Sequence, residues 1–297
     1  MTPLKILPAE DIAAQVVEYF KGEINPTDFG FIYRRYDTPP KTNPDRFTDG
    51  KIYGYRAQVP FYPASVVKTF FMVALLEQVK EKTIILDTED ERALENMIRI
   101  SSNDATSYVL DRITGAHGGA ALSHAKMEAW WEKRSWVQRY FESYNWPEFD
   151  PIKVFHSTFE ESPYGREQIA RDLYGSNSLT PLAAATLMHA IAAGQMIDPV
   201  YSGQMMGLLS REWERDPRPL VKGEVDQVQG YIAEAVPDHL KIWSKAGLTS
   251  VTRHDLVYVE GPRGQAMTIA VFSQGKACAE SMQFLPTLGR FLLDPIE

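Results

Sequence analysis

The chain has 297 residues, with 31 Lys and Arg against 39 Asp and Glu and a formal net charge of -8. This acidic balance gives no overall attraction for nucleic acid, and no run approaches the roughly 18 apolar residues of a membrane span, so we expect neither a nucleic-acid partner nor a transmembrane segment. The single cysteine, Cys278, excludes an internal disulfide and a zinc site built from several thiolates.

The start of the chain predicts a helix followed by two strands. Apolar residues recur at helical spacing over residues 8–21, whereas residues 29–33 and 51–56 are typical of strands. Acidic side chains stand within the first 20 residues, where a signal peptide would have its apolar core. We therefore expect a cytoplasmic protein if the chain is complete, and a periplasmic or secreted one if a leader was removed.

A helix buried on every side is predicted for residues 65–79, because apolar side chains occupy almost all of its positions. Thr88 with Glu91 fits a capping box and predicts a second helix that ends near Ile100. Helical spacing then resumes over residues 104–113.

Residues 116–180 show no clear periodicity and carry many aromatic side chains, so we expect irregular structure there. Packing in a core is the first interpretation of these rings, and lining of a cleft is the alternative. Thr180-Pro181 then favours the start of a helix that runs to about Ala193, since proline is preferred in a first turn.

The last quarter predicts strands at residues 241–248, 256–260 and 266–273, and a helix at 280–293. Strands at both ends of the chain enclose mainly helical sequence. The predicted fold class is therefore α+β, a three-layer α/β/α sandwich. Its antiparallel sheet of about five strands is built from both termini and flanked by helices, with an inserted, mainly helical subdomain.

We expect residues 1–60 and 238–297 to form the sheet-containing part and residues 61–237 to form the helical part, with a cleft between the two in one folding unit. The chain has no Walker A loop, no GxGxxG, and no histidine pair at metal-ligand spacing. We expect no cofactor and no metal.

Ser65-Val-Val-Lys68 is the most promising catalytic motif, because residues three apart on a helix share a face and the amine can reach the hydroxyl. Burial would lower the pKa of such a lysine and let it act as a base. The same spacing recurs at Ser123 and Lys126 and at Ser273 and Lys276. Only the first copy begins a helix expected to be buried.

Two further motifs follow along the chain. Ser101-Ser-Asn103 stands at a junction between predicted helices, where it fits either a simple N-cap or polar groups that project into a cleft. Lys245-Ala-Gly247 stands on a predicted strand, where it fits either a surface lysine beside a glycine bulge or a site lysine.

Taken in this order, the three motifs resemble those of the penicillin-recognising serine hydrolases, and more narrowly of the class A β-lactamase family. The resemblance covers roughly residues 10–295. It includes the stretches 61–68, 100–105, 180–181, 243–247 and 261–264.

The resemblance implies that Ser65 is the acylated nucleophile and Lys68 a base or proton relay. Ser101 would pass a proton to the leaving nitrogen, Asn103 would hydrogen-bond the substrate amide, and Lys245 would supply positive charge.

It also implies that the backbone N–H groups of Ser65 and Leu248 form an oxyanion hole. Gly247 would let the substrate approach the strand edge.

Two departures from the family pattern concern the substrate carboxylate and the second half of the reaction. Ala246 replaces the hydroxyl residue of the third motif, so Arg253 or His254 is a candidate replacement cation, with a plain surface position as the alternative. The candidates for a water-activating carboxylate are Glu160, Glu161 and Glu167. Glu161 is favoured by its separation from Pro181 along the sequence.

The leading functional prediction is a serine hydrolase that acts through a Ser65 acyl-enzyme on a β-lactam or a related amide or ester. One alternative is a penicillin-binding D-Ala-D-Ala peptidase or esterase with poor deacylation. Another is a non-catalytic binding scaffold. The expected partner is a small-molecule or peptide substrate, and the sequence leaves the oligomeric state open.

Overall fold

A computed structural model describes residues 8–40, 50–158, 165–212 and 226–293 of the chain. Its described residues form one five-stranded antiparallel sheet with the order β2-β1-β5-β4-β3. The strands are β1 (Phe29–Tyr36), β2 (Lys51–Tyr55), β3 (Lys241–Thr249), β4 (Thr252–Glu260) and β5 (Ala266–Ser273).

The two ends of the chain meet at the centre of this sheet. β1 pairs with β5 from Phe29 opposite Ser273 to Tyr36 opposite Ala266. β4 and β5 are buried almost throughout, because helices cover both faces of the sheet. The prediction of one antiparallel sheet assembled from both termini is therefore confirmed.

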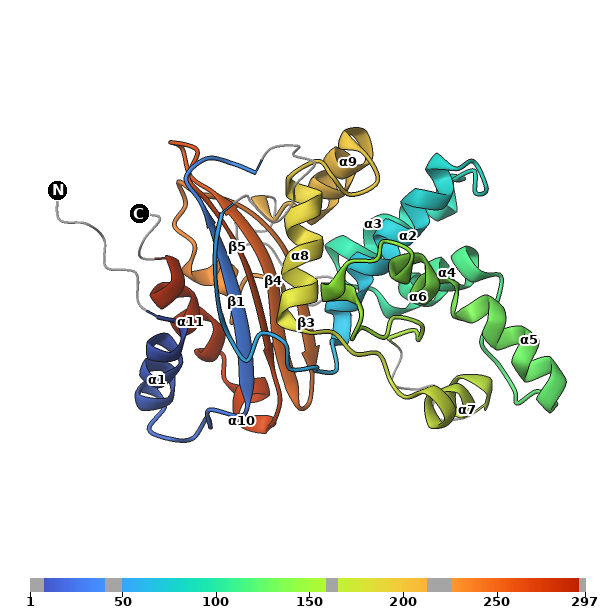
Figure 1. Cartoon of the computed structure of the whole chain (residues 1–297), viewed down its shortest axis with the longest axis horizontal. Helices are drawn as coiled ribbons and strands as arrows, with labels where there is room; N and C mark the ends of the chain where they lie inside the picture. Colours follow the sequence, from blue (N-terminus) through green and yellow to red (C-terminus); the bar gives the residue numbers. More distant parts are fainter. Residues whose placement is uncertain (1–7, 41–49, 159–164, 213–225, 294–297) are drawn as a thin grey trace.

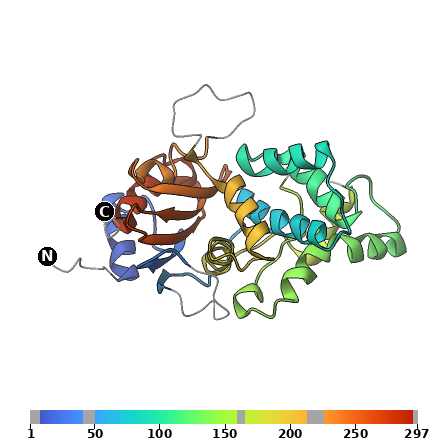
Figure 2. The same cartoon turned by 90° about the horizontal axis from the view of Figure 1, so that it is seen from above.

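One face of the sheet is covered by the terminal helices α1 (Ala9–Tyr19) and α11 (Phe284–Leu293), which lie side by side (Figure 1). Helix α8 (Pro181–Ala192) packs on the other face, against β1, β4 and β5. The helices between residues 68 and 174 gather beyond α8, at one side of the sheet (Figure 2). Separate apolar cores fill the two sides of the sheet.

The remaining helical elements complete these layers. They are η1 (Ala64–Val67), α2 (Lys68–Lys80), α3 (Thr88–Arg99), α4 (Asn103–Thr114), α5 (His124–Arg134), α6 (Trp136–Glu142), η2 (Pro147–Phe149), α7 (Gly165–Tyr174), α9 (Pro199–Leu209), η4 (Ile232–Ala235) and α10 (Lys276–Glu280).

The central buried helix is confirmed, but its start differs from the prediction. Every residue of α2 from Lys68 to Leu76 is buried. Ser65 lies not on an α-helix but in the 3-10 turn η1, directly after Ala64, whose φ of 45° is left-handed. Strain of this kind gathers at functional sites.

The predicted capping box of α3 was one residue late. Asp87 is the N-cap, and its carboxylate accepts hydrogen bonds from the backbone N–H groups of Glu89 and Asp90. The Asp90 carboxylate accepts from the backbone N–H of Asp87, so the reciprocal pair is Asp87 and Asp90. Thr88 already belongs to the helix.

Other boundaries need correction as well. The stretch expected to be irregular contains the helices α5, α6 and α7, because bulky rings that pack on several sides obscure the helical period. β4 begins at Thr252 rather than Leu256, and α9 and α10 were not predicted. The helix expected over residues 280–293 is α11, which begins at Phe284.

The aromatic side chains of this stretch pack in a core, as the first interpretation held. The rings of Phe141 and Phe149 lie 4.8 Å and 5.9 Å from the ring of Phe70 on α2. Trp131 stacks on Tyr174 at 3.7 Å. Phe159 lies outside the described residues.

Candidate functional site

The first two motifs meet at the buried amine of Lys68. Its Nζ donates to the backbone carbonyl of Ser101 at 2.6 Å and to Oδ1 of Asn103 at 2.8 Å, and it lies 3.2 Å from the hydroxyl of Ser101. Ser101 stands between α3 and α4 with a left-handed φ of 59°. This backbone geometry turns both its carbonyl and its hydroxyl toward Lys68.

The third motif reaches the same hydroxyl from the sheet. Lys245 on β3 is fully buried, and its Nζ donates to Ser101 Oγ at 2.9 Å and to the carbonyl of Ala246 at 3.0 Å. Ser101 Oγ therefore lies between two lysine amines from separate elements. The N-cap of α4 is Ser102, whose hydroxyl accepts from the backbone N–H of Ala105.

Desolvation dominates the electrostatics of Lys68. The side chain has no exposed surface, and burial lowers its pKa from 10.5 to about 7. Losing the proton removes the cost of a buried charge, so a large share of the molecules carry a neutral amine near neutral pH. A neutral amine has a free lone pair that can accept a proton from a hydroxyl.

A buried pair that the sequence analysis missed joins β3 to the Ser101 turn. Gln227 Oε1 accepts from Lys245 Nζ at 2.7 Å, while its Nε2 donates to the carbonyl of Arg99 at 2.6 Å. The guanidinium of Arg211 donates to the carbonyls of Arg99 and Ser244 at 2.9 Å each. Lone polar residues in loops carry no spacing signal, so only the structure identifies this link.

A cavity of about 460 Å³ opens beside these groups. Its lining includes Ser65, Asn103 and Leu248, so the predicted nucleophile, amide and oxyanion residue face one space. The lining also includes residues that the sequence analysis did not single out: Tyr62, Ala64, Thr158, Thr249, Ser250 and Ala279.

Gly247 was expected to let the substrate approach the strand edge, but in the structure it allows a close approach between two parts of the chain. A Cβ atom there would lie 3.1 Å from the carbonyl oxygen of Pro63 and 3.3 Å from Cβ of Ala64. The missing side chain therefore lets β3 pack against the turn that carries Ser65. The Ala246 side chain is buried in the core on the terminal-helix side of the sheet.

The two candidate cations behave differently, and neither is a surface residue. Arg253 is buried and lines the cavity, with its Nε donating to the carbonyl of Ala279 at 3.0 Å and its guanidinium over the ring of Tyr231. His254 accepts from the N–H of Ser273 through Nδ1 and binds the Tyr62 carbonyl through Nε2.

Burial lowers the pKa of His254 to about 4. The ring is therefore neutral at neutral pH, and the hydrogen bonds assign its proton to Nε2. Arg253 is the candidate cation that remains.

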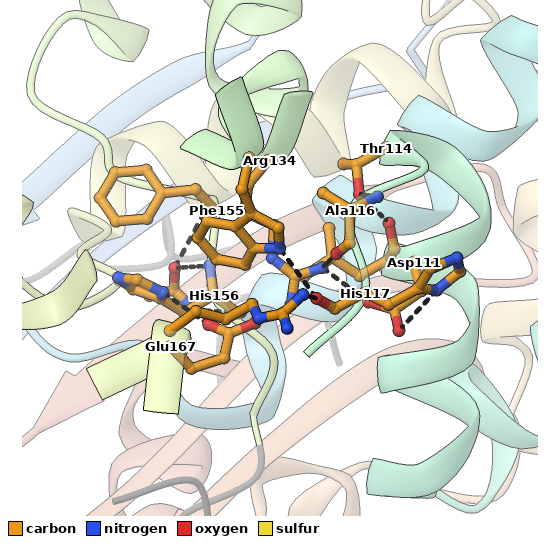
Figure 3. A network of polar contacts seen from close by, with 12 residues as sticks. Asp111, Thr114, Ala116, His117, Arg134, Phe155, His156 and Glu167 are labelled. Atoms are coloured by element: carbon orange, nitrogen blue, oxygen red, sulfur yellow. Dashed lines mark hydrogen bonds and ion pairs between the residues drawn. The ribbon is translucent and has the colours of Figure 1, made fainter. Parts of the chain in front are cut away.

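Glu167 belongs to a buried ion-pair network and is absent from the cavity lining (Figure 3). Its carboxylate binds Arg134 and lies 3.0 Å from His156 Nδ1. Burial alone would raise the pKa of Glu167, but the bond to His156 and the charge of Arg134 outweigh it and hold the pKa below its ordinary value. Glu160 and Glu161 lie outside the described residues.

The described residues contain no group of three His, Cys, Asp or Glu side chains placed to hold a metal ion. In the same part of the chain, no helix is long and apolar enough to cross a membrane.

Comparison with known proteins gives one family. Residues 32–91 and 90–295 match the model described as the Beta-lactamase enzyme family. A comparison with curated protein sequences found no match.

Several solved structures share the fold. The β-lactamase of Sphaerobacter thermophilus DSM 20745 is 17% identical, with a TM-score of 0.65 over 97% of each chain. That of Chitinophaga pinensis DSM 2588 is 15% identical, with a TM-score of 0.67 over 97% of this chain and all of that one. A PBP-A mutant, solved as an acyl-enzyme complex with penicillin G, is 17% identical, with a TM-score of 0.66 over 98% of each chain.

We predict that Glu167→Gln lowers the free energy of unfolding by about 2 kcal/mol, because the buried Arg134 guanidinium keeps Asp111 as a counter-charge but loses its charge-assisted bond to Glu167. Since the pKa of Glu167 is lowered, this advantage of the wild type is present above pH 4.5 and is lost as the pH falls below it. Urea unfolding at several pH values measures both effects.

Glu132→Gln is the matched control, because Glu132 pairs with Arg139 at the surface and its loss should cost less than about 1 kcal/mol. Equal stability of Glu167→Gln and wild type at pH 7 would contradict the role of the network.

Proposed function

Because the chain belongs to the beta-lactamase enzyme family, we propose that it is a serine hydrolase that forms an acyl-enzyme on Ser65. The proposed substrate is a β-lactam or a related amide or ester. The observation that carries the proposal is the convergence of Lys68 and Lys245 on the Ser101 hydroxyl beside the cavity that Ser65 lines.

Acylation begins in this proposal with Lys68 in its neutral form. The amine accepts the proton of Ser65 as Oγ attacks the substrate carbonyl carbon, and a tetrahedral oxyanion forms. The backbone N–H groups of Ser65 and Leu248 stabilise the oxyanion, since both residues line the same cavity.

The leaving nitrogen receives its proton from Ser101. As the carbon–nitrogen bond breaks, Ser101 Oγ gives its proton to the nitrogen and takes one from the Lys68 ammonium, 3.2 Å away. Lys68 returns to its neutral form, and the ester to Ser65 remains. The Lys245 charge favours proton release from Ser101 Oγ at a distance of 2.9 Å.

Substrate orientation is assigned to two groups at the cavity wall. The Asn103 amide donates to a carbonyl of the substrate, and the Arg253 guanidinium binds a substrate carboxylate in place of the hydroxyl that Ala246 lacks. A charge-assisted bond of this kind is about twice as strong as a neutral one. The hydroxyls of Thr249 and Ser250 line the cavity together with Arg253.

A penicillin-binding peptidase or esterase with slow deacylation is the second candidate. It is favoured by the position of Glu167, whose carboxylate is bound to Arg134 and His156 and does not line the cavity. The cavity lining among the described residues holds the hydroxyl of Thr158 and no carboxylate.

Intact mass spectrometry with excess benzylpenicillin, followed together with drug absorbance, tests the proposal. Wild type should gain an adduct, consume drug, or do both, and Ser65→Ala should do neither. Lys68→Ala should slow acylation by about 10²-fold or more, because the base is lost. Ser123→Ala is the matched control, since it removes the exposed serine of another S-x-x-K copy and should behave as wild type.

A persistent adduct would favour the slow-deacylating candidate, and drug loss without a lasting adduct would favour a β-lactamase. Neither adduct nor drug loss would count against the proposal and favour a binding scaffold. Full activity of Ser65→Ala would contradict the acyl-enzyme on Ser65.

The pH dependence of acylation should follow Lys68. With a pKa of about 7, the amine is protonated and inactive as a base at low pH, so the labelling rate should be about tenfold lower at pH 6 than on its plateau above pH 8. Second-order labelling rates from pH 5 to 9 measure this profile. A rate still rising steeply at pH 9 would contradict the lowered pKa.

A further inference from the structure

Thr158 supplies an unexpected hydroxyl to the wall of the cavity. Its side chain is 7% exposed, and Oγ1 donates to Oδ1 of Asn103 at 2.8 Å. The same oxygen accepts from Lys68 Nζ, also at 2.8 Å. Thr158 and Lys68 therefore share one acceptor, although they are 90 residues apart in sequence.

The backbone before Thr158 is held in place by Asn177. Its Oδ1 accepts from the backbone N–H groups of Phe155 at 3.0 Å and His156 at 2.9 Å, and its Nδ2 donates to the carbonyl of His156 at 2.7 Å. All of these groups are buried. These bonds hold the backbone two and three residues before Thr158.

The ring of His156 ties the same segment to the helical layer. It binds Glu167 through Nδ1 and the carbonyl of Gly175 through Nε2, so the anchor reaches α7 (Figure 3). Such a buried network costs free energy unless its members are satisfied. Because His156 lies two residues before Thr158, the network favours one fixed position of the Thr158 hydroxyl.

The hydrogen bonds at Asn103 determine which way its amide faces. A neutral Lys68 amine has two N–H donors, which the Ser101 carbonyl and Asn103 Oδ1 accept, so its lone pair is left for a hydroxyl. The hydroxyl of Thr158 also donates to Asn103 Oδ1 and keeps this oxygen on the side of Lys68. Asn103 lines the cavity, so its Nδ2 donors are the groups that remain for a substrate carbonyl.

We propose that Thr158 is a positioning residue for acylation, which orients the Asn103 amide and through it the lone pair of Lys68. The proposal rests on the proposed acyl-enzyme at Ser65. It assigns Thr158 no contact with the reacting atoms: its hydroxyl acts through Asn103.

The test compares Thr158→Val, which keeps the shape and removes the hydroxyl, with Thr158→Ser, which keeps the hydroxyl. Ser65 labelling by benzylpenicillin is measured by mass across pH 5 to 9, with melting temperatures as a check on folding. Thr268→Val is the matched control, because Thr268 on β5 is also a buried threonine, whose hydroxyl lies 3.0 Å from the hydroxyl of Tyr36 and does not line the cavity.

Thr158→Val should acylate about tenfold more slowly or worse, as expected when a reacting group loses its alignment. Its pH profile should move to higher pH, because Asn103 Oδ1 then serves the Lys68 ammonium alone and stabilises the charged form. Thr158→Ser should restore both the rate and the profile, and Thr268→Val should match wild type.

The inference would be overturned, and the proposed function left intact, if wild type were labelled at Ser65 and Thr158→Val showed the same rate and pH profile. The inference would also be overturned if Thr158→Val acylated slowly with an unchanged pH profile and Thr158→Ser did not restore the rate. That result would indicate an effect on packing. Absence of Ser65 labelling in the wild type would overturn the proposed function and this inference together.

Discussion

A single buried amine constrains the whole candidate site. Lys68 lies on a helix without exposed surface, where an ammonium group is costly unless it is hydrogen-bonded. The acceptors come from the turn between α3 and α4, which holds Ser101 in a left-handed conformation to present them. Desolvation of Lys68 favours the neutral amine, whereas the acceptors of the Ser101 turn satisfy its N–H groups and hold the amine beside a hydroxyl.

The site also depends on contacts that join the sheet to the helical layer. Lys245 reaches Ser101 from β3, Gln227 and Arg211 bridge the same two parts, and Gly247 lets β3 approach the turn before Ser65. A site made in this way requires both parts of the fold, which is consistent with the family match that runs across most of the chain.

The three motifs and the sheet were predictable from the sequence, because helix spacing, strand pattern and motif order are local properties. The 3-10 turn at Ser65 and the capping role of Asp87 were not predictable, since both depend on the backbone angles of several neighbouring residues. Thr158 escaped prediction because a lone threonine has no pattern, and its role comes from Asn177, 19 residues later in the chain. His254 was misjudged as a possible cation because burial cannot be inferred from a polar residue alone.

A crystal structure of the protein after reaction with benzylpenicillin would show whether Ser65 carries the acyl group. We expect density continuous from Ser65 Oγ to the opened drug, with its carbonyl oxygen between the backbone N–H groups of Ser65 and Leu248 and its carboxylate at Arg253. Density joined to another residue, or an intact drug lying in the cavity with Ser65 unmodified, would contradict the acyl-enzyme on Ser65.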